Sequence, residues 1–214
     1  MTEGYNRLRW GLMEIVLVYG GVLLIANLVG AYSMHSWWLE GKPLVQFSLV
    51  AGVQFLATIG LVLVFTIGKK ASWAELGLRP ASLRDILIYG CGTGLVLLLF
   101  MLVVSSIVYL ASITSISPQL YETMLRNAGH GASFVLLFFM GAVLAPVSEE
   151  LFYRAMIYPF LRNALGPVWG ILLAGLVFGL AHWDVWRTIP LAIGGLVLCY
   201  VYERTGSIYV PMVA

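Results

Sequence analysis

Four ionisable side chains interrupt segments that are otherwise apolar enough for a membrane. Glu149, Glu150 and Arg154 follow the apolar run 134–147 without an intervening polar loop, and His182 ends a second apolar run. An ionisable group at membrane depth costs at least about 2.5 kcal/mol on insertion scales, so such groups usually serve a function. These residue types could activate a water molecule for hydrolysis, and we take them as the candidate site.

Helical geometry separates the two adjacent glutamates. Glu150 and Arg154 are four residues apart, so they share a helix face and can form a charge pair. Glu149 lies about 100° away around the helix and has no partner for such a pair at i+3 or i+4. We therefore predict that Glu149 is free to act as a general base.

A turn between the two apolar runs brings the acidic residues and the histidine to one depth. Leu165-Gly166-Pro167 has the composition of a tight turn. Glu149 and His182 are symmetric about it, each about 21 Å away along a straight helix. An antiparallel hairpin would place them side by side, with Phe178 packed one turn before His182.

A carboxylate beside an imidazole makes a water-activating pair, in which the histidine orients the water or stabilises charge. The same pair could bind a metal ion, but two ligands are too few for a closed zinc site. We predict no cofactor, and a bound divalent metal is the less favoured alternative. The residues could also be structural, as an ion pair and an interfacial histidine, but their joint placement about one turn favours a functional site. The sequence has no His-Glu-x-x-His and no Gly-x-Ser-x-Gly motif.

The composition indicates an integral membrane protein. Of 214 residues, 61% are hydrophobic and only 10% are charged, whereas a soluble domain has about 45–50% apolar and about 25% charged residues. The net charge of +2 is too small for an electrostatic grip on nucleic acid. Two cysteines within apolar stretches exclude a disulfide scaffold.

Apolar stretches of about 20 residues predict membrane-spanning helices. The predicted fold is all-α, a polytopic transmembrane helix bundle with six full spans plus a truncated seventh. We treat residues 1–214 as a single membrane domain, with N-terminal spans in 1–131. The spans are Gly11–Tyr32, Leu44–Gly68, Ile86–Ala111, Ala132 past Pro146, Val168–His182 and Thr188–Tyr202, with a seventh from Ile208.

The positive charges predict the orientation, because cytoplasmic loops are enriched in Lys and Arg. Alternate numbering of the loops gives 9 of the 12 basic residues to the side of the N-terminus, which we therefore place in the cytoplasm. The other side has Lys42, Arg126 and Arg187. In the second cytoplasmic loop, Ser72 and Glu75 have the spacing of a capping box and predict a short interfacial helix.

Two motifs resemble those of the CAAX-protease and bacteriocin-processing (CPBP) family of glutamate intramembrane proteases. The family's Glu-Glu-x-x-x-Arg motif is matched by residues 149–154, and its Phe-x-x-x-His motif by residues 178–182. The stretch 76–79, Leu-Gly-Leu-Arg, is also similar to family members. The core of the resemblance covers about 133–214.

The resemblance implies a role for each matched residue. Glu149 would be the catalytic base that activates water with His182, Glu150 and Arg154 would support the site, and Phe178 would line it. Water would attack the peptide carbonyl directly, without an acyl-enzyme. Eukaryotic members remove the last three residues of a prenylated protein, and some prokaryotic members are linked to bacteriocin maturation or self-immunity. We expect an intramembrane endopeptidase of a prokaryotic cell membrane, with a prenylated or membrane-associated peptide or protein as substrate.

The family's third motif, a His followed four residues later by Asn or a similar residue, does not occur before Ala214. One interpretation is that the reading frame continues past Ala214 with that His, and this is our prediction. The alternative is a catalytically inactive family member that acts as a bacteriocin self-immunity or scaffolding membrane protein. A small proton-coupled transporter is a third hypothesis, but it predicts inverted repeats, and the sequence shows none.

Overall fold

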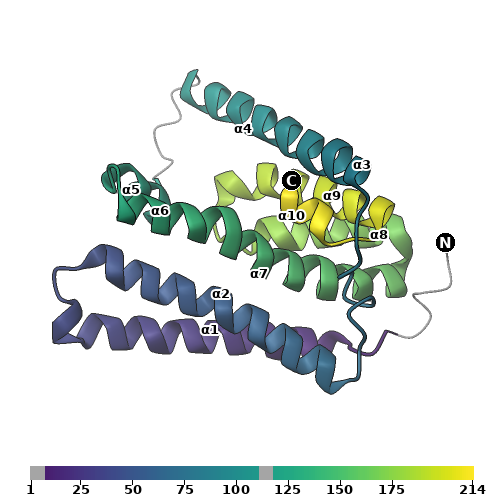
Figure 1. Cartoon of the computed structure of the whole chain (residues 1–214), viewed down its shortest axis with the longest axis horizontal. Coiled ribbons are helices and arrows are strands. Elements are labelled where there is room, and N and C mark those ends of the chain that lie inside the picture. The colour runs from purple at the N-terminus through teal and green to yellow at the C-terminus, as the bar shows by residue number, and fades with distance from the viewer. Residues whose placement is uncertain (1–7, 111–117) are drawn as a thin grey trace.

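The described residues form helices and no strands. The computed structural model describes residues 8–110 and 118–214, and the predicted all-helical membrane bundle is confirmed over them (Figure 1). The chain order is α1 (Leu12–His35), the 3-10 turn η1 (Trp37–Leu39), α2 (Pro43–Gly68), α3 (Leu83–Asp85), the π-helical η2 (Ile86–Cys91), α4 (Gly92–Leu110), α5 (Leu120–Asn127), α6 (Ala132–Phe139), the π-helical η3 (Met140–Leu144), α7 (Ala145–Phe152), the π-helical η4 (Tyr153–Ile157), α8 (Tyr158–Leu180), α9 (Val185–Thr205) and α10 (Tyr209–Val213).

Four helical segments among the described residues are long and apolar enough to cross a membrane. They are Leu12–His35, Pro43–Gly68, Leu83–Leu110 and the 49-residue segment Ala132–Leu180. The first three match the first three predicted spans, although Ala111 lies outside the described residues. The fourth contains both the fourth and the fifth predicted spans. Helix α9 covers the sixth, and α10 lies where the seventh was predicted to begin.

A single glycine folds the longest segment back on itself. Gly166 has a φ of +83°, which L side chains rarely adopt, and it interrupts α8. A Cβ added to Gly170 would lie 2.9 Å from the backbone of Arg162, so the two sides of the turn are in contact. The tight turn predicted at 165–167 is therefore confirmed, and it reverses the chain between α7 and the second half of α8.

Small residues let α8 and α9 cross closely. A Cβ on Gly179 would lie 2.4 Å from the carbonyl oxygen of Thr188, and one on Gly175 would meet the backbone of Leu196. From the other side, a Cβ on Gly195 would lie 3.0 Å from the Cα of Gly175. Close crossings of this kind stabilise helix pairs in membranes, because the hydrophobic effect does not drive helices together in lipid and van der Waals packing must do so.

Helices α1 and α2 form a hairpin that packs against α7 (Figure 1). A hydrogen bond just before α1 attaches the hairpin to the rest of the chain, and an ion pair joins its two helices. The indole Nε1 of Trp10 donates to the carbonyl oxygen of Met156 over 3.0 Å. Glu14, which is 4% exposed, accepts from the Gly11 amide and pairs with Lys69 at 2.8 Å. This ion pair connects the start of α1 to the end of α2.

The loop after α2 forms a turn, so the predicted interfacial helix at 72–75 is wrong. The capping-box bonds do form, because the Ser72 amide donates to the Glu75 carboxylate and the Glu75 amide donates to the Ser72 hydroxyl oxygen. Gly77, with a φ of +74°, then turns the chain so that the buried Leu76 faces the core. The amide of Ile208 donates to the Gly77 carbonyl, so the loop is fastened to the C-terminal helices.

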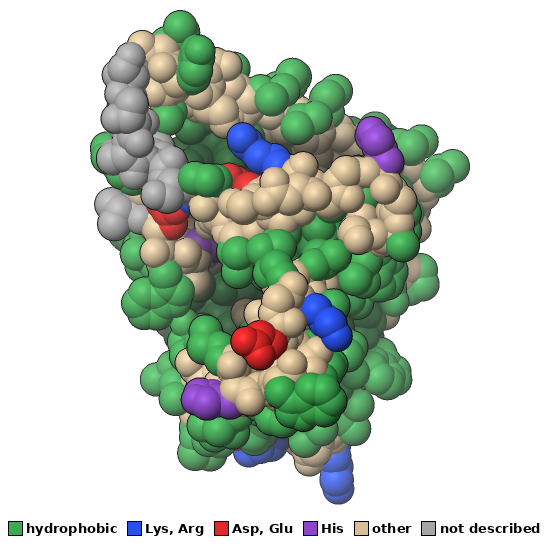
Figure 2. Space-filling model, turned by 90° about the vertical axis from the view of Figure 1, so that its left-hand side faces the viewer, with side chains coloured by type: hydrophobic (Ala, Val, Ile, Leu, Met, Phe, Trp, Pro, Cys, Tyr) green, Lys and Arg blue, Asp and Glu red, His purple; other side chains and the backbone are tan. Residues whose placement is uncertain are grey.

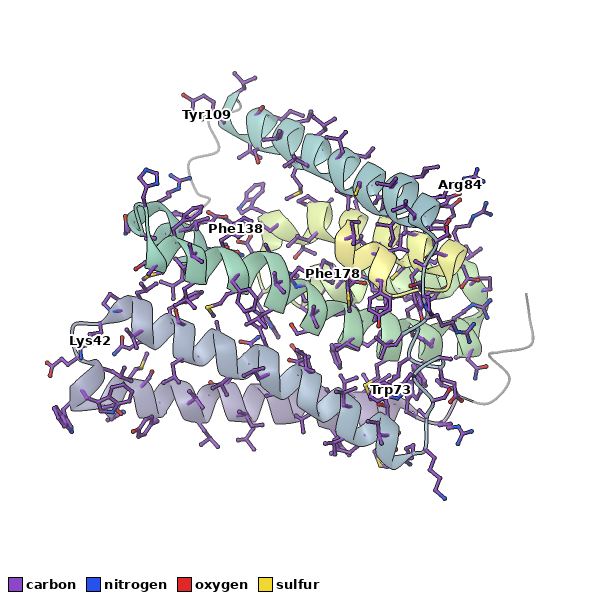
Figure 3. The ribbon with its side chains drawn as sticks, in the orientation of Figure 1. Lys42, Trp73, Arg84, Tyr109, Phe138 and Phe178 are labelled. Atoms are coloured by element: carbon purple, nitrogen blue, oxygen red, sulfur yellow. The ribbon has the colours of Figure 1, made fainter. Side chains whose placement is uncertain are left out.

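The two ends of the bundle differ in charge. Lys42 and Arg84 lie at opposite ends (Figure 3). The end that carries Lys42 shows few charged side chains among many hydrophobic ones (Figure 2). The opposite end holds the ion pairs Arg9–Glu75, Lys69–Glu14 and Arg162–Glu203. Of the basic residues assigned to the N-terminal side, Arg154 is instead buried inside the bundle, and Arg7 lies outside the described residues. The orientation across the membrane stays a prediction.

Candidate active site

Glu149 and His182 line the same two cavities, as the hairpin geometry predicted. The larger one, of about 390 Å³, lies between α1, α2, α7 and the end of α8. The smaller one, of about 310 Å³, lies between α2, α5, η3 and α7. Glu149 comes from the last turn of α7, and His182 follows α8 in a short turn. A peptide bond between them would have space on both sides.

A backbone contact fixes the orientation of the His182 ring. Its Nδ1 lies 2.8 Å from the carbonyl oxygen of Phe178. A carbonyl oxygen only accepts hydrogen bonds, so Nδ1 carries the proton in the neutral ring. Nε2 then has a free lone pair, which can accept a hydrogen bond from water or bind a cation.

The Glu150–Arg154 pair lies behind the cavity wall, as the i, i+4 spacing predicted. Nη1 of Arg154 donates to Oε1 of Glu150 over 2.7 Å, and both side chains are almost fully buried. Nη2 of Arg154 also donates to the carbonyl oxygen of Gly195 in α9. Oε2 of Glu150 and Nε of Arg154 have no hydrogen-bond partner among the described residues. The pair therefore holds α7, η4 and α9 together and faces away from both cavities.

Phe178 joins the arginine to the histidine. The guanidinium carbon of Arg154 lies 4.9 Å from the centre of the Phe178 ring, a cation–π contact. The same ring meets His182 edge-on, with centroids 5.0 Å apart. Phe178 thus positions the imidazole from two directions, through its ring and through its carbonyl oxygen.

An apolar groove adjoins the larger cavity. It has a volume of about 570 Å³ and lies between α1 and the junction of α8 with α9. Both spaces are lined by Tyr19, Phe152, Tyr153, Ala181 and Trp183. Trp183 has a φ of +52° and is 82% exposed, so its backbone turns directly after His182 and its ring stands at the junction. An apolar segment in the groove would lie beside the candidate catalytic groups.

Metal binding would have to use few protein ligands. Glu149 and Nε2 of His182 are the groups placed to contact a cation. Over residues 8–110 and 118–214, no group of three or more His, Cys, Asp and Glu side chains is arranged to hold a metal ion. The expectation of no cofactor stays a prediction.

Comparison with known proteins supports the family resemblance over the C-terminal part of the chain. Residues 131–214 match the family model described as type II CAAX prenyl endopeptidase Rce1-like. A 79-residue stretch is 25% identical to the Bacillus subtilis (strain 168) protein named "Putative membrane peptidase YdiL". The matched stretch is 37% of this chain and 32% of that relative. Both matches support the resemblance of this region to the CPBP family, and we refer to residues 131–214 as the CPBP region. No solved structure matches the chain.

The CPBP region does not form the site alone. The larger cavity is also lined by residues from α1 and α2, outside the matched range: Val18, Tyr19, Val22, Leu23, Gln54, Phe55 and Thr58. Sequence reasoning missed these residues. The polar Gln54 and Thr58 within an apolar span were the available signal, because a polar side chain at membrane depth tends to face protein or water.

Proposed function

We propose that this chain is an intramembrane endopeptidase, in which Glu149 and His182 activate the water that hydrolyses a peptide bond. The observation that carries the proposal is that the two side chains line the same cavities inside the membrane bundle. The CPBP match of residues 131–214 supports the same chemistry. Glu150, Arg154 and Phe178 act as positioning residues.

The proposed reaction needs one water molecule and no covalent enzyme intermediate. The Glu149 carboxylate takes one proton from the water, while Nε2 of His182 accepts a hydrogen bond from the other hydrogen and orients the oxygen. The oxygen attacks the peptide carbonyl carbon, and the π electrons of the carbonyl move to its oxygen. When this intermediate collapses, the C–N bond breaks and the leaving nitrogen takes the proton from Glu149. The products are a carboxylic acid and an amine.

The proposed substrate carries an apolar group close to the scissile bond. The groove of about 570 Å³ beside the site is lined mainly by apolar side chains and adjoins the cavity that holds Glu149. A prenylated or otherwise membrane-associated peptide satisfies this requirement. The description of the matched family names a CAAX prenyl endopeptidase, which has the same substrate chemistry.

We also propose that the N-terminal end of the bundle faces the cytoplasm of a prokaryotic cell. The ion pairs Arg9–Glu75 and Lys69–Glu14 lie at this end, and so does the basic-rich second loop. Lys42 lies at the opposite end. The excess of basic residues at one end is typical of the cytoplasmic side.

A cleavage screen tests the proposed function. The purified protein, reconstituted in lipid vesicles, is incubated with matched internally quenched peptides, one with an S-farnesyl cysteine near its C-terminus and one without. We expect cleavage by the wild type, with the farnesylated peptide preferred, and none by Glu149→Ala. Equal cleavage by wild type and Glu149→Ala would contradict the proposal.

A further inference from the structure

Tyr153 places a hydroxyl group on the same helix face as Glu149. The two residues are four apart, across the junction of α7 and η4, so their side chains lie one above the other. Both line the larger cavity. Tyr153 also lines the apolar groove. Its side chain is therefore located where the two spaces meet.

The ring of Tyr153 is held on several sides. It meets Phe152 edge-on at 5.3 Å and Phe178 edge-on at 4.9 Å between centroids. The residue is 8% exposed. A donor that is fixed before the reaction begins costs no reorganisation when charge develops, which is the property of an effective oxyanion-hole group.

The hydroxyl is also free to bind substrate, since it makes no hydrogen bond with any residue of the described ranges. The serine and threonine hydroxyls of the cavity wall differ in this respect. Ser148 donates to the carbonyl oxygen of Ala145, and Thr58 donates to that of Gln54. Nδ1 of His182 is engaged by the Phe178 carbonyl. Tyr153 thus offers an unengaged donor beside the proposed base.

Two other polar groups of the cavity are less well fixed. Gln54 is an exposed residue of α2, and Tyr19 of α1 is half-buried. Tyr19 stacks on Phe152 at 6.2 Å, but α1 lies across the cavity from the helix that carries Glu149. Neither shares a helix face with the base.

We infer that the Tyr153 hydroxyl is a catalytic residue, which donates a hydrogen bond to the carbonyl oxygen of the scissile peptide as that oxygen becomes an oxyanion. This inference rests on the proposed function and adds a residue to it. The phenol keeps its proton throughout. When the intermediate collapses, the electron pair on the oxyanion re-forms the carbonyl and the hydrogen bond weakens. The donor lies at the groove side of the site, so it meets the substrate where its apolar group enters.

The test compares tyrosine-to-phenylalanine variants that remove one hydroxyl each. For Tyr153→Phe we expect kcat on the farnesylated quenched peptide to fall about 10²–10³-fold, with KM little changed, because one oxyanion donor is lost. Tyr158→Phe is the matched control. That tyrosine is fully buried, directly follows η4, and its hydroxyl donates to Glu203 away from the cavity. We expect Tyr158→Phe to keep its kcat.

Four outcomes separate this inference from the proposed function. Loss of kcat in Tyr153→Phe, with an unfolding temperature equal to that of the wild type, supports the inference. Unchanged kcat in Tyr153→Phe, with cleavage abolished by Glu149→Gln, overturns the inference and leaves the proposed function standing. A larger loss in Tyr19→Phe than in Tyr153→Phe also overturns the assignment. Full activity of Glu149→Gln overturns the proposed function itself.

Discussion

Glu150 and Arg154 carry opposite charges in a place that would tolerate neither alone. Each is almost completely buried, and the 2.7 Å bond between them is supplemented by the Gly195 carbonyl and the Phe178 ring. Burial of an ion pair gives little net stability, but loss of one partner leaves an uncompensated charge. The fold around Glu149 therefore requires both partners of the pair.

Removal of the arginine alone is predicted to destabilise the bundle strongly. Arg154→Met leaves Glu150 buried and unpaired, and we expect the free energy of unfolding to fall by about 3–5 kcal/mol. The double variant Glu150→Leu/Arg154→Met removes both charges and should recover a large part of this loss. Denaturant unfolding in detergent micelles measures the free energy of unfolding of both variants. A double variant that is less stable than the single one would contradict this account.

Residue spacing predicted part of the site and missed the rest. The i, i+4 rule identified the Glu150–Arg154 pair because both partners are charged and lie on one helix. Restricted to charged partners, the same rule gives Glu149 no partner, so it does not find the Tyr153 hydroxyl on the same helix face. The pairing of Glu14 with Lys69 joins different helices, and no local spacing indicates it.

At the scale of elements, the crossing of α8 and α9 sets the position of His182. Gly179 lies three residues before the histidine and touches α9 at the carbonyl of Thr188. A larger residue there must push the helices apart, because the contact is backbone. The glycine is thus required by the close approach of the two helices.

Substitution of this glycine should affect both stability and activity. We predict that Gly179→Ala destabilises the protein by about 1–3 kcal/mol through overpacking, and that it lowers kcat because His182 shifts with the end of α8. Gly194→Ala is the matched control, since a Cβ there meets nothing within 4 Å. Thermal unfolding and peptide cleavage measure the two effects. Equal stability of the two variants would argue against a close crossing.

The charged carboxylate of Glu75 stabilises the loop after α2. The pKa of Glu75 lies below its ordinary value of 4.5, because its carboxylate accepts hydrogen bonds from the Ser72 amide and hydroxyl and lies near the Arg9 charge. Burial raises the pKa by a smaller amount. Because the folded-state pKa is the lower one, the stabilisation is complete above the unfolded-state pKa and is lost as the pH falls through the folded-state pKa.

We therefore predict that Glu75→Gln lowers the unfolding temperature at neutral pH and that the difference from the wild type vanishes in acid. Thermal unfolding of both proteins between neutral pH and pH values below the ordinary pKa of 4.5 measures this. A difference that stayed constant across this range would show that Glu75 contributes without its charge.

Element prediction succeeded where a single residue dictates the backbone. Gly166 and Pro167 gave the turn because few residues adopt a φ of +83°. The interfacial helix at 72–75 failed for a tertiary reason. Its capping bonds form, but Leu76 docks in the core and Gly77 contacts Tyr202, so the chain turns before a helix can continue.

For the whole molecule, the N-terminal hairpin completes a site that the matched CPBP region begins. Trp10 and Glu14 fasten α1, and α2 packs on α7. Hydropathy predicted the membrane bundle because so few residues are charged, and it indicated nothing about which helices meet. The cavity wall formed by α1 and α2 depends on contacts between residues that are distant in sequence. The hydrophobic periodicity of a single sequence does not predict such contacts.

The orientation of the molecule can be read with single cysteines. In a Cys91→Ser background, we predict that Glu40→Cys reacts with a membrane-impermeant maleimide on intact cells, because it lies at the end of the bundle that carries Lys42. Ala74→Cys, an exposed position in the loop after α2, should react only after lysis. The reverse labelling pattern would place the N-terminus outside.

The central claim is that Glu149 activates water for peptide hydrolysis, and the cleavage rate of Glu149→Gln in lipid vesicles tests it most directly. Glutamine keeps the size and polarity of the side chain and removes its ability to take a proton. We predict that this variant unfolds at the wild-type temperature and cleaves no detectable farnesylated peptide. A folded Glu149→Gln protein that cleaves the peptide at the wild-type rate would contradict the account.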